Sequence, residues 1–171
     1  MADVTVRSAR PDEYERVAQV TIDAYRALEV DHLFDGYDDE IRDVAGRAER
    51  AEVLVAVDAD GAVLGAVTFV SDPESAWLEW AEPGEVQFRL LAVDPNVQGR
   101  GVGELLARAC VERARALGAP IVIHTTQWMH GAHRLYPRLG FRRAPERDVH
   151  ELYPGWVFEA YVLDPAPPEH A

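Results

Sequence analysis

The order of apolar and polar positions along the chain predicts a fold that mixes strands and helices. Val4 and Val6 alternate with polar neighbours, as in a short strand over 4–7. A helix is expected to begin near Pro11, because proline is tolerated in a first turn. Apolar residues then recur at helical spacing and form a buried stripe: Val17, Val20, Ala24 and Leu28.

Two valine-rich stretches further along predict a β-hairpin. They span 52–58 and 62–70, and Asp60-Gly61 between them is a strong turn signal, because glycine adopts positive φ easily. A single, more polar helix is expected before the hairpin, over 38–50.

The segment 71–84 has no clear period and contains two tryptophans, Trp77 and Trp80. We interpret it as a loop that either covers a site or folds back onto the core. A strand is expected over 85–93, and Pro95 shortly after it marks its end.

A glycine-rich loop, Gln98-Gly99-Arg100-Gly101-Val102-Gly103, joins this strand to an amphipathic helix that ends at Gly118. Glycine lets the backbone approach a ligand closely, and the amides and dipole of a helix N-terminus attract anions. Arg100 adds positive charge at the same place. The pattern therefore predicts a phosphate or pyrophosphate ligand.

Two common nucleotide motifs do not fit this loop. A P-loop requires a lysine, and the chain has none. The dinucleotide-binding fingerprint requires a third glycine at a spacing that is absent here, and it follows the first strand of a βαβ unit rather than a mid-chain strand.

Composition indicates one globular domain, expected over 1–164, with a disordered proline-rich tail over 165–171. Apolar residues make up 48% of the chain and charged residues 27%, yet no stretch is long and apolar enough for a membrane helix. We expect no signal peptide and a cytoplasmic location. The single cysteine, Cys110, excludes an internal disulfide and a multi-cysteine zinc site, and we expect it to be a small core residue.

The net charge of −13 is unevenly distributed. Residues 1–85 carry 7 arginines against 21 acids, whereas residues 98–147 carry 9 arginines against 3 acids. An acidic protein of this kind disfavours nucleic acid as a partner. The arginine-rich block either serves a polyanionic ligand or reflects drift in surface composition.

Two further segments give the glycine loop a family context. Leu91-Ala92-Val93-Asp94-Pro95 precedes it, and Ala132-His133-Arg134-Leu135-Tyr136-Pro137-Arg138-Leu139-Gly140-Phe141 follows it. Together with Gln98–Gly103, these segments resemble the motifs of the GNAT superfamily, the acyl-CoA-dependent N-acetyltransferases. The resemblance implies an α/β (α+β) fold: a mixed, mostly antiparallel sheet of about seven strands, splayed between the fourth and fifth, with about four helices.

The resemblance also implies acetyl-CoA as cosubstrate, without a metal. The cofactor would lie in the gap between the fourth and fifth strands, with its pantetheine arm paired to backbone groups and its pyrophosphate held by the loop. The cofactor-binding residues implied in this way are Leu91, Ala92, Val93, Gln98, Gly99, Arg100, Gly101, Val102 and Gly103.

Tyr136 matches the family's tyrosine, which implies a general acid that protonates the leaving thiolate. The sequence departs from the family pattern at two nearby positions. Met129 stands where many members have an asparagine, and Pro137 directly follows the tyrosine and removes a helical hydrogen bond.

The general base is open at this stage. The resemblance implies a glutamate on the fourth strand, at a position closer to Gln87, which cannot accept the proton. Glu85 is the leading candidate, because alternation places it on the same face as Gln87 and Leu91. The alternatives are three histidines, His124, His130 and His133.

The acceptor is expected to be a primary amine on a cationic small molecule that attacks acetyl-CoA directly in a ternary complex. This expectation rests on the acids between Glu29 and Asp43 and on interleaved aromatics such as Tyr25 and Tyr37. A protein N-terminus and an amino-bearing antibiotic are alternative acceptors, and a non-catalytic acyl-CoA sensor is an alternative function. The loop 153–156 is expected to line the acceptor pocket or to form a homodimer contact.

Overall fold

The computed structural model describes residues 3–28, 36–150 and 152–165. The predicted tail, apart from Pro165, lies outside these residues. A first sheet has the order β1-β2-β3-β4, with every neighbouring pair antiparallel. Its strands are β1 (Thr5–Ser8), β2 (Glu52–Val57), β3 (Val63–Val70) and β4 (Gln87–Val93).

A second sheet is built around the C-terminal strand β8 (Val157–Leu163). Three strands pair with it in antiparallel fashion: β5 (Ile121–Thr126), β6 (Arg142–Arg143) and β7 (Val149–His150). The last two are only two residues long. The described residues thus form eight strands, where about seven were expected.

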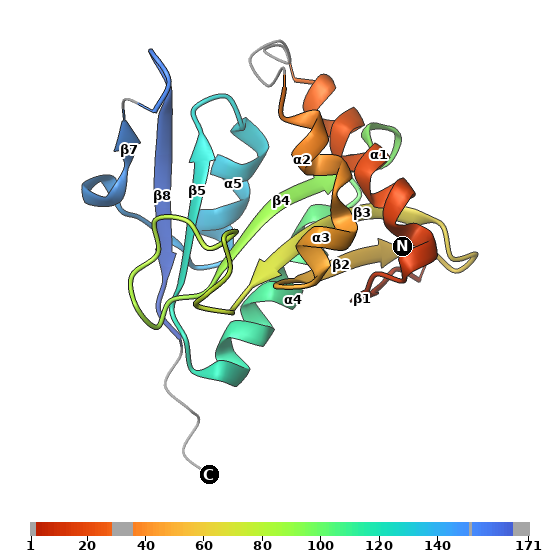
Figure 1. The fold of residues 1–171 in the computed structure, drawn as a ribbon, viewed down its shortest axis with the longest axis horizontal. Helices are drawn as coiled ribbons and strands as arrows, with labels where there is room; N and C mark the ends of the chain where they lie inside the picture. The colour runs from red at the N-terminus through yellow and green to blue at the C-terminus, as the bar shows by residue number, and fades with distance from the viewer. Residues whose placement is uncertain (1–2, 29–35, 151, 166–171) are drawn as a thin grey trace.

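The two sheets meet where the start of β4 lies beside the start of β5 (Figure 1). The Val86 amide donates to the Pro120 carbonyl at 2.9 Å, and the Val122 amide donates to the Val86 carbonyl at 3.0 Å. Beyond this parallel bridge, the described parts of β4 and β5 share no further backbone pairing. This confirms the prediction of a mixed, mostly antiparallel sheet that divides between its fourth and fifth strands.

Helices cover both faces of the first sheet. On one face α1 (Tyr14–Arg26), which follows the 3-10 turn η1 (Pro11–Glu13), packs against the hairpin of β2 and β3. On the other face α4 (Val102–Leu117) packs against the same strands and β4. The remaining long helix, α5 (His130–Arg138), stands beside β5 (Figure 1). None of the helices in the described ranges is long and apolar enough to cross a membrane.

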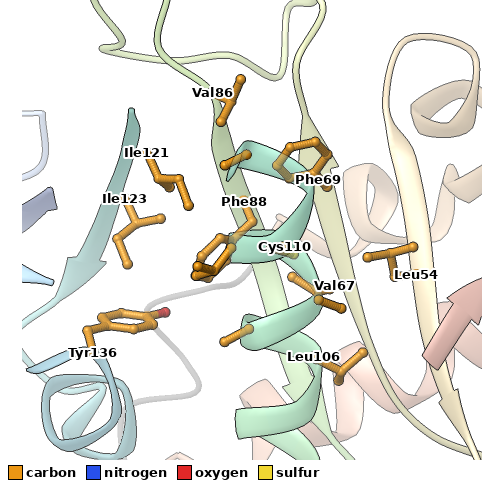
Figure 2. Packing of buried hydrophobic residues seen from close by; sticks show 14 of the residues in the cluster. Leu54, Val67, Phe69, Val86, Phe88, Leu106, Cys110, Ile121, Ile123 and Tyr136 are labelled. Atoms are coloured by element: carbon orange, nitrogen blue, oxygen red, sulfur yellow. The ribbon is translucent and has the colours of Figure 1, made fainter. Parts of the chain in front are cut away.

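The main core lies between α4 and the sheets (Figure 2). Leu54, Leu106 and Cys110 are fully buried there, and Phe88 and Ile123 close the core toward α5. Cys110 is therefore a core residue, as its place in the apolar stripe predicts. Successive side chains of β2, β3 and β4 point to opposite faces of the sheet. Those on one face pack in this core, and those on the other face pack against α1.

The expected single helix over 38–50 is instead two short helices, α2 (Asp38–Arg42) and α3 (Val44–Ala48). The break falls at Asp43, whose backbone has φ −79° and ψ 59°. The Asp43 side chain accepts a hydrogen bond from the Gly46 amide at 3.0 Å and so caps α3. Apolar periodicity alone cannot separate two such helices, because both bury residues toward α1.

Replacing this cap should destabilise the fold measurably. We expect Asp43→Ala to lower the free energy of unfolding by about 1 kcal/mol, because the Gly46 amide loses its acceptor. Urea denaturation measures the change. The control is Asp39→Ala, which removes an equal charge from an exposed position of α2 and should change stability by less than about 0.5 kcal/mol. Equal effects of the two variants would show that Asp43 acts through charge and not as a cap.

Candidate active site

A β-bulge interrupts β4 in the middle of the strand. The register with β3 shifts between Ala66 and Thr68, and Leu90 adopts a positive φ of 55°. Such a bulge inserts one residue and changes which face the next side chains take. Leu91 consequently packs with Phe88 on the α4 side. The expectation that Leu91 shares a face with Glu85 and Gln87 is therefore wrong.

The bulge also decides where backbone groups of β4 point. The Asp94 amide donates to the Leu64 carbonyl at 2.8 Å, and Ala92 lies opposite Ala66 in the same ladder. Because antiparallel pairing alternates, the N–H and C=O groups of Leu91 and Val93 point away from β3 and toward the gap beside β5. This is the arrangement that an added, extended chain such as a pantetheine arm requires.

The far side of the gap offers unpaired polar groups. The hydroxyls of Thr125 and Thr126, at the end of β5, are buried and have no hydrogen-bond partner among the described residues. Buried hydroxyls normally have partners. Neighbouring side chains of a strand point to opposite faces, so at most one of these two hydroxyls can face a ligand in the gap. The free backbone groups of β4 and one such hydroxyl fit the cofactor that the motifs imply.

The glycine loop lies at the N-terminus of α4, as predicted. Gly99 and Gly101 both have φ of 79°, and Gly101 is the N-cap residue of the helix. A Cβ atom placed on either glycine would meet no other atom within 4 Å, so the space over the loop is open. Arg100 between them is exposed. Free amides, an open approach and a cation together fit a pyrophosphate.

A substitution in this loop should weaken cofactor binding specifically. We expect Gly101→Ala to raise KM for acetyl-CoA about tenfold, because a side chain disfavours positive φ by roughly 1–2 kcal/mol and the loop must shift. KM for the amine should change little in steady-state kinetics. The matched control is Gly61→Ala, in the β2–β3 hairpin, where φ is 83°. A similar rise in KM in the control would attribute the effect to lost stability instead.

Tyr136 lies on α5 and points its ring into the core beside β4 (Figure 2). Its ring centroid is 5.9 Å from that of Phe88, 5.6 Å from Phe141 and 5.5 Å from Tyr161. Burial raises the pKa of Tyr136, so its hydroxyl stays protonated at neutral pH. The structure thus keeps the proton that a general acid would donate.

Pro137 does not end α5, which continues to Arg138. The Leu139 amide donates to the Leu135 carbonyl at 3.3 Å, so the turn around the proline is maintained. Met129 occupies the N-cap position of α5, and its side chain forms no capping hydrogen bond. The helix therefore tolerates both departures from the family pattern.

Glu85 forms a buried ion pair with Arg147, from the 3-10 turn η4 (Pro145–Arg147). Arg147 Nη2 lies 2.8 Å from Glu85 Oε2, and the Glu82 amide donates to the same oxygen at 2.7 Å. Burial alone would raise the pKa of Glu85, but these two contacts outweigh it and lower the pKa. Glu85 is held as an anchored carboxylate, and its role as general base stays a prediction.

The alternative histidines differ in their surroundings. His133 uses both ring nitrogens, with Nδ1 2.7 Å from the Tyr161 hydroxyl and Nε2 2.9 Å from the Thr126 carbonyl. His124 contacts the Arg147 carbonyl through Nε2, while its buried Nδ1 has no partner in the described structure. Burial lowers the pKa of His124, which keeps the ring neutral at pH 7. His130 is exposed.

Most of the arginine-rich block is engaged in ion pairs within the protein. Arg138 lies 2.9 Å from Glu104, Arg142 3.5 Å from Glu146, and Arg143 lies 2.6 Å from Asp148. The interpretation of the block as a set of phosphate partners is therefore too broad. The phosphate role of Arg100 stays a prediction, and this side chain is exposed beside the glycine loop.

The face of β4 opposite α4 lies toward α1, α2 and α3, and we call it the acceptor side because the acceptor is expected there. It contains two arginines that sequence reasoning missed. Arg47 of α3 and Arg89 of β4 both lie against the indole of Trp77, with guanidinium carbons 5.4 and 5.0 Å from its centroid. Arg89 also donates to the Tyr37 hydroxyl at 3.1 Å. We call Arg47, Trp77, Arg89 and Tyr37 the arginine–tryptophan cluster. The position of Arg89 inside the apolar run 88–91 was the signal in the sequence that could have indicated a buried polar cluster.

Only part of the acidic run that suggested a cationic acceptor lies within the described residues. Its members between Glu29 and Asp35 lie outside the described residues. In the described part, Asp38 pairs with Arg26 at 2.8 Å and Asp43 caps α3, so both acids are engaged within the protein, and neither forms an ion pair with the cluster.

Two loops place tryptophans beside the second sheet. Trp80 of the 71–84 loop meets His124 edge-on with ring centroids 5.1 Å apart, and lies 5.2 Å from the Phe158 ring in a tilted arrangement. The loop between β7 and β8 places Trp156 4.8 Å from Trp128. The 71–84 loop therefore covers the sheet and also supplies Trp77 to the acceptor side.

A split sheet with a glycine loop at one end of the gap and a buried tyrosine beside it defines an acyltransferase that uses a CoA thioester. Residues 14–141 match the sequence profile of the acetyltransferase (GNAT) family, and the chain belongs to that family. This confirms the predicted enzyme class, an acetyl-CoA-dependent N-acetyltransferase, with acetyl-CoA as cosubstrate. Within the described ranges, no three His, Cys, Asp or Glu side chains group as metal ligands.

Similar proteins include solved structures and one curated relative. A GNAT acetyltransferase from Brucella melitensis in complex with acetyl-CoA is 25% identical, with a TM-score of 0.65 over 98% of this chain and 91% of that chain. A Corynebacterium glutamicum structure described as histone acetyltransferase HPA2 and related acetyltransferase is 20% identical, with a TM-score of 0.76 over 99% and 100%, and shows the shared fold. N-acetylaspartate synthetase of Danio rerio is 37% identical over 68 residues, which is 39% of this chain but only 24% of that protein.

Proposed function

We propose that the protein acetylates a primary amine by direct attack on acetyl-CoA in a ternary complex. The observation that carries the proposal is the position of the β4 bulge. Leu90 faces the acceptor side while Leu91 faces α4, so the strand separates a cofactor side from an acceptor side at one point. An amine and a thioester can meet there without a covalent enzyme intermediate. Cys110 is unsuited to such an intermediate because it is fully buried.

The reaction needs two proton transfers, and the chain offers a group for each. The amine nitrogen bonds to the thioester carbonyl carbon, the bond from that carbon to sulfur breaks, and the electron pair leaves on sulfur. Tyr136 would donate its hydroxyl proton to that sulfur. The proton lost by the amine would pass to Glu85, or to the neutral His124 through its unpartnered Nδ1.

The acceptor class is the part of the proposal that needs direct measurement. The name of the zebrafish relative says that it makes N-acetylaspartate, which supports an amino compound as acceptor. A protein N-terminus and an amino-bearing antibiotic are the competing acceptors, and a cationic amine is the acceptor that the acidic run suggested. Release of free CoA thiol over a panel of these compounds ranks them.

The same measurement separates an enzyme from a non-catalytic acyl-CoA sensor. Amine-dependent thiol release supports the enzyme. Binding of acetyl-CoA by calorimetry, with no thiol release for any amine class, would overturn the proposal in favour of the sensor. A cytoplasmic location and a homodimer both stay predictions, and light scattering of the purified chain tests the second.

A further inference from the structure

The arginine–tryptophan cluster contains a buried cation that the described protein does not neutralise. Arg47 is 1% exposed, and among the residues that the structure describes no carboxylate pairs with it. A buried charge without a partner is costly, and proteins normally pair it or bind a counter-ion there. Desolvation is the main cause that lowers the pKa of Arg47, and the charge of Arg89 adds to it, while the Asp43 carboxylate acts in the opposite direction without forming an ion pair.

Only one part of the Arg47 guanidinium serves the fold. Its Nη1 donates to the carbonyls of Glu40 and Ile41, both at 3.1 Å, and so caps the end of α2. Nε is buried and has no partner in the described structure, and Nη2 donates no hydrogen bond to a described residue. Nε and Nη2 form the edge of arginine that binds a carboxylate with two parallel hydrogen bonds.

Arg89 brings a second guanidinium to the same tryptophan. It is fixed by the Trp77 carbonyl and the Tyr37 hydroxyl, both at 3.1 Å, and by Glu79 at 3.3 Å. The Glu79 side chain is 44% exposed, so this pair lies at the solvent edge of the cluster. Two cations against one indole repel each other, and an anion near both would relieve the repulsion.

The cluster lies beside the β4 bulge. Arg89 directly precedes Leu90, the residue at the bulge, and Leu90 packs with Tyr25, Tyr37 and Trp77. Tyr25 also lies near enough to Tyr136 to influence the pKa of that phenol. A ligand bound to the two arginines would therefore hold its neighbouring atoms beside the bulge, on the face opposite α4.

We propose that the acceptor is an amine that carries an acidic group, such as an amino acid, and that Arg47 and Arg89 bind this acidic group. The inference rests on the proposed function and assigns the substrate class of the same site. It reverses the charge expected from the acidic run, because Trp77, which packs with Leu90 at the bulge, carries two arginines against its ring. The amine would lie toward β4 and the carboxylate toward Trp77.

The test compares acceptors that differ in one charge. We would measure thiol release with the standard amino acids, their methyl esters and the diamine putrescine. Acid-bearing amines should have kcat/KM about 30-fold or more above their esters, because a hydrogen-bonded ion pair is lost in the ester. Turnover that favours esters or putrescine would overturn the inference and leave the proposed function intact. No turnover with any amine would overturn both.

Variants assign the effect to the two arginines. Arg89→Gln and Arg47→Lys should each raise KM for the acidic acceptor about tenfold or more and leave KM for acetyl-CoA unchanged. Arg47→Lys keeps a cation that can cap α2, so it separates recognition from folding. The control is Arg50→Gln, which removes an arginine that is 56% exposed and paired with Asp72. Unchanged acceptor KM in both cluster variants would overturn the assignment.

Discussion

Tyr136→Phe should lower kcat about 10³-fold and leave the affinity for acetyl-CoA nearly unchanged. The variant removes only the hydroxyl and keeps the ring contacts with Phe88, Phe141 and Tyr161. The thiolate must then leave without a positioned proton donor. Because burial raises the pKa of Tyr136, the wild-type hydroxyl carries its proton over the whole neutral range.

Two measurements keep this result specific to proton donation. Calorimetry of acetyl-CoA binding checks that the cofactor side is intact. Tyr14→Phe, at the start of α1 and away from the gap, is the matched control and should keep full kcat. Full kcat in Tyr136→Phe would show that a different group or water protonates the thiolate.

Glu85→Gln should lower the free energy of unfolding by about 3 kcal/mol at pH 7, because Arg147 is left as a largely buried cation without its partner. The side chains of the pair are only 7% and 17% exposed. The folded-state pKa of Glu85 is lowered, so its stabilisation is present above the unfolded pKa of about 4.3 and is lost as the pH falls through the folded pKa. The difference between wild type and variant should therefore narrow at acidic pH.

The matched control for this prediction is Glu104→Gln. Glu104 pairs with Arg108 and Arg138 on the surface, with those arginines 56% and 62% exposed, and its loss should cost less than about 1 kcal/mol. Urea denaturation between pH 3 and pH 7 measures both. An equally small effect in Glu85→Gln would contradict the importance of burial.

The same Glu85 variant decides the role of this carboxylate in catalysis. A general base predicts a loss of kcat of about 10²-fold or more and a changed pH–rate profile. An anchor for Arg147 predicts lower stability with an unchanged profile. In the second case His124 becomes the first group to replace, since its Nδ1 is without a partner among the described residues.

Local sequence patterns predicted the parts of the fold that depend on neighbours in the chain. The Asp60-Gly61 hairpin, the glycine loop and the Gly118 cap are each determined by a few residues with special backbone conformations. The family motifs then supplied the split between β4 and β5, which no local pattern reveals. The arrangement of the strands depends on pairing between distant segments, so only the resemblance to the family could predict it.

The remaining features depend on contacts between distant segments. The bulge at Leu90 has no signal in a run of apolar residues, so strict alternation put Leu91 on the wrong face. Glu85 and Arg147 are 62 positions apart, and their pairing became visible only in three dimensions. The meeting of Arg47 and Arg89 at Trp77 could not be predicted for the same reason, because the three residues lie on separate segments of the chain.

The burial of Cys110 has a practical consequence for every experiment that follows thiols. It is the only cysteine of the chain, it is fully buried on the inner face of α4, and burial raises its pKa. The folded protein should therefore contribute no background when a thiol reagent detects released CoA. Labelling of Cys110 requires an opening of the core, so its slow rate reports global unfolding. One mixture thus yields turnover from the fast signal and conformational stability from the slow one.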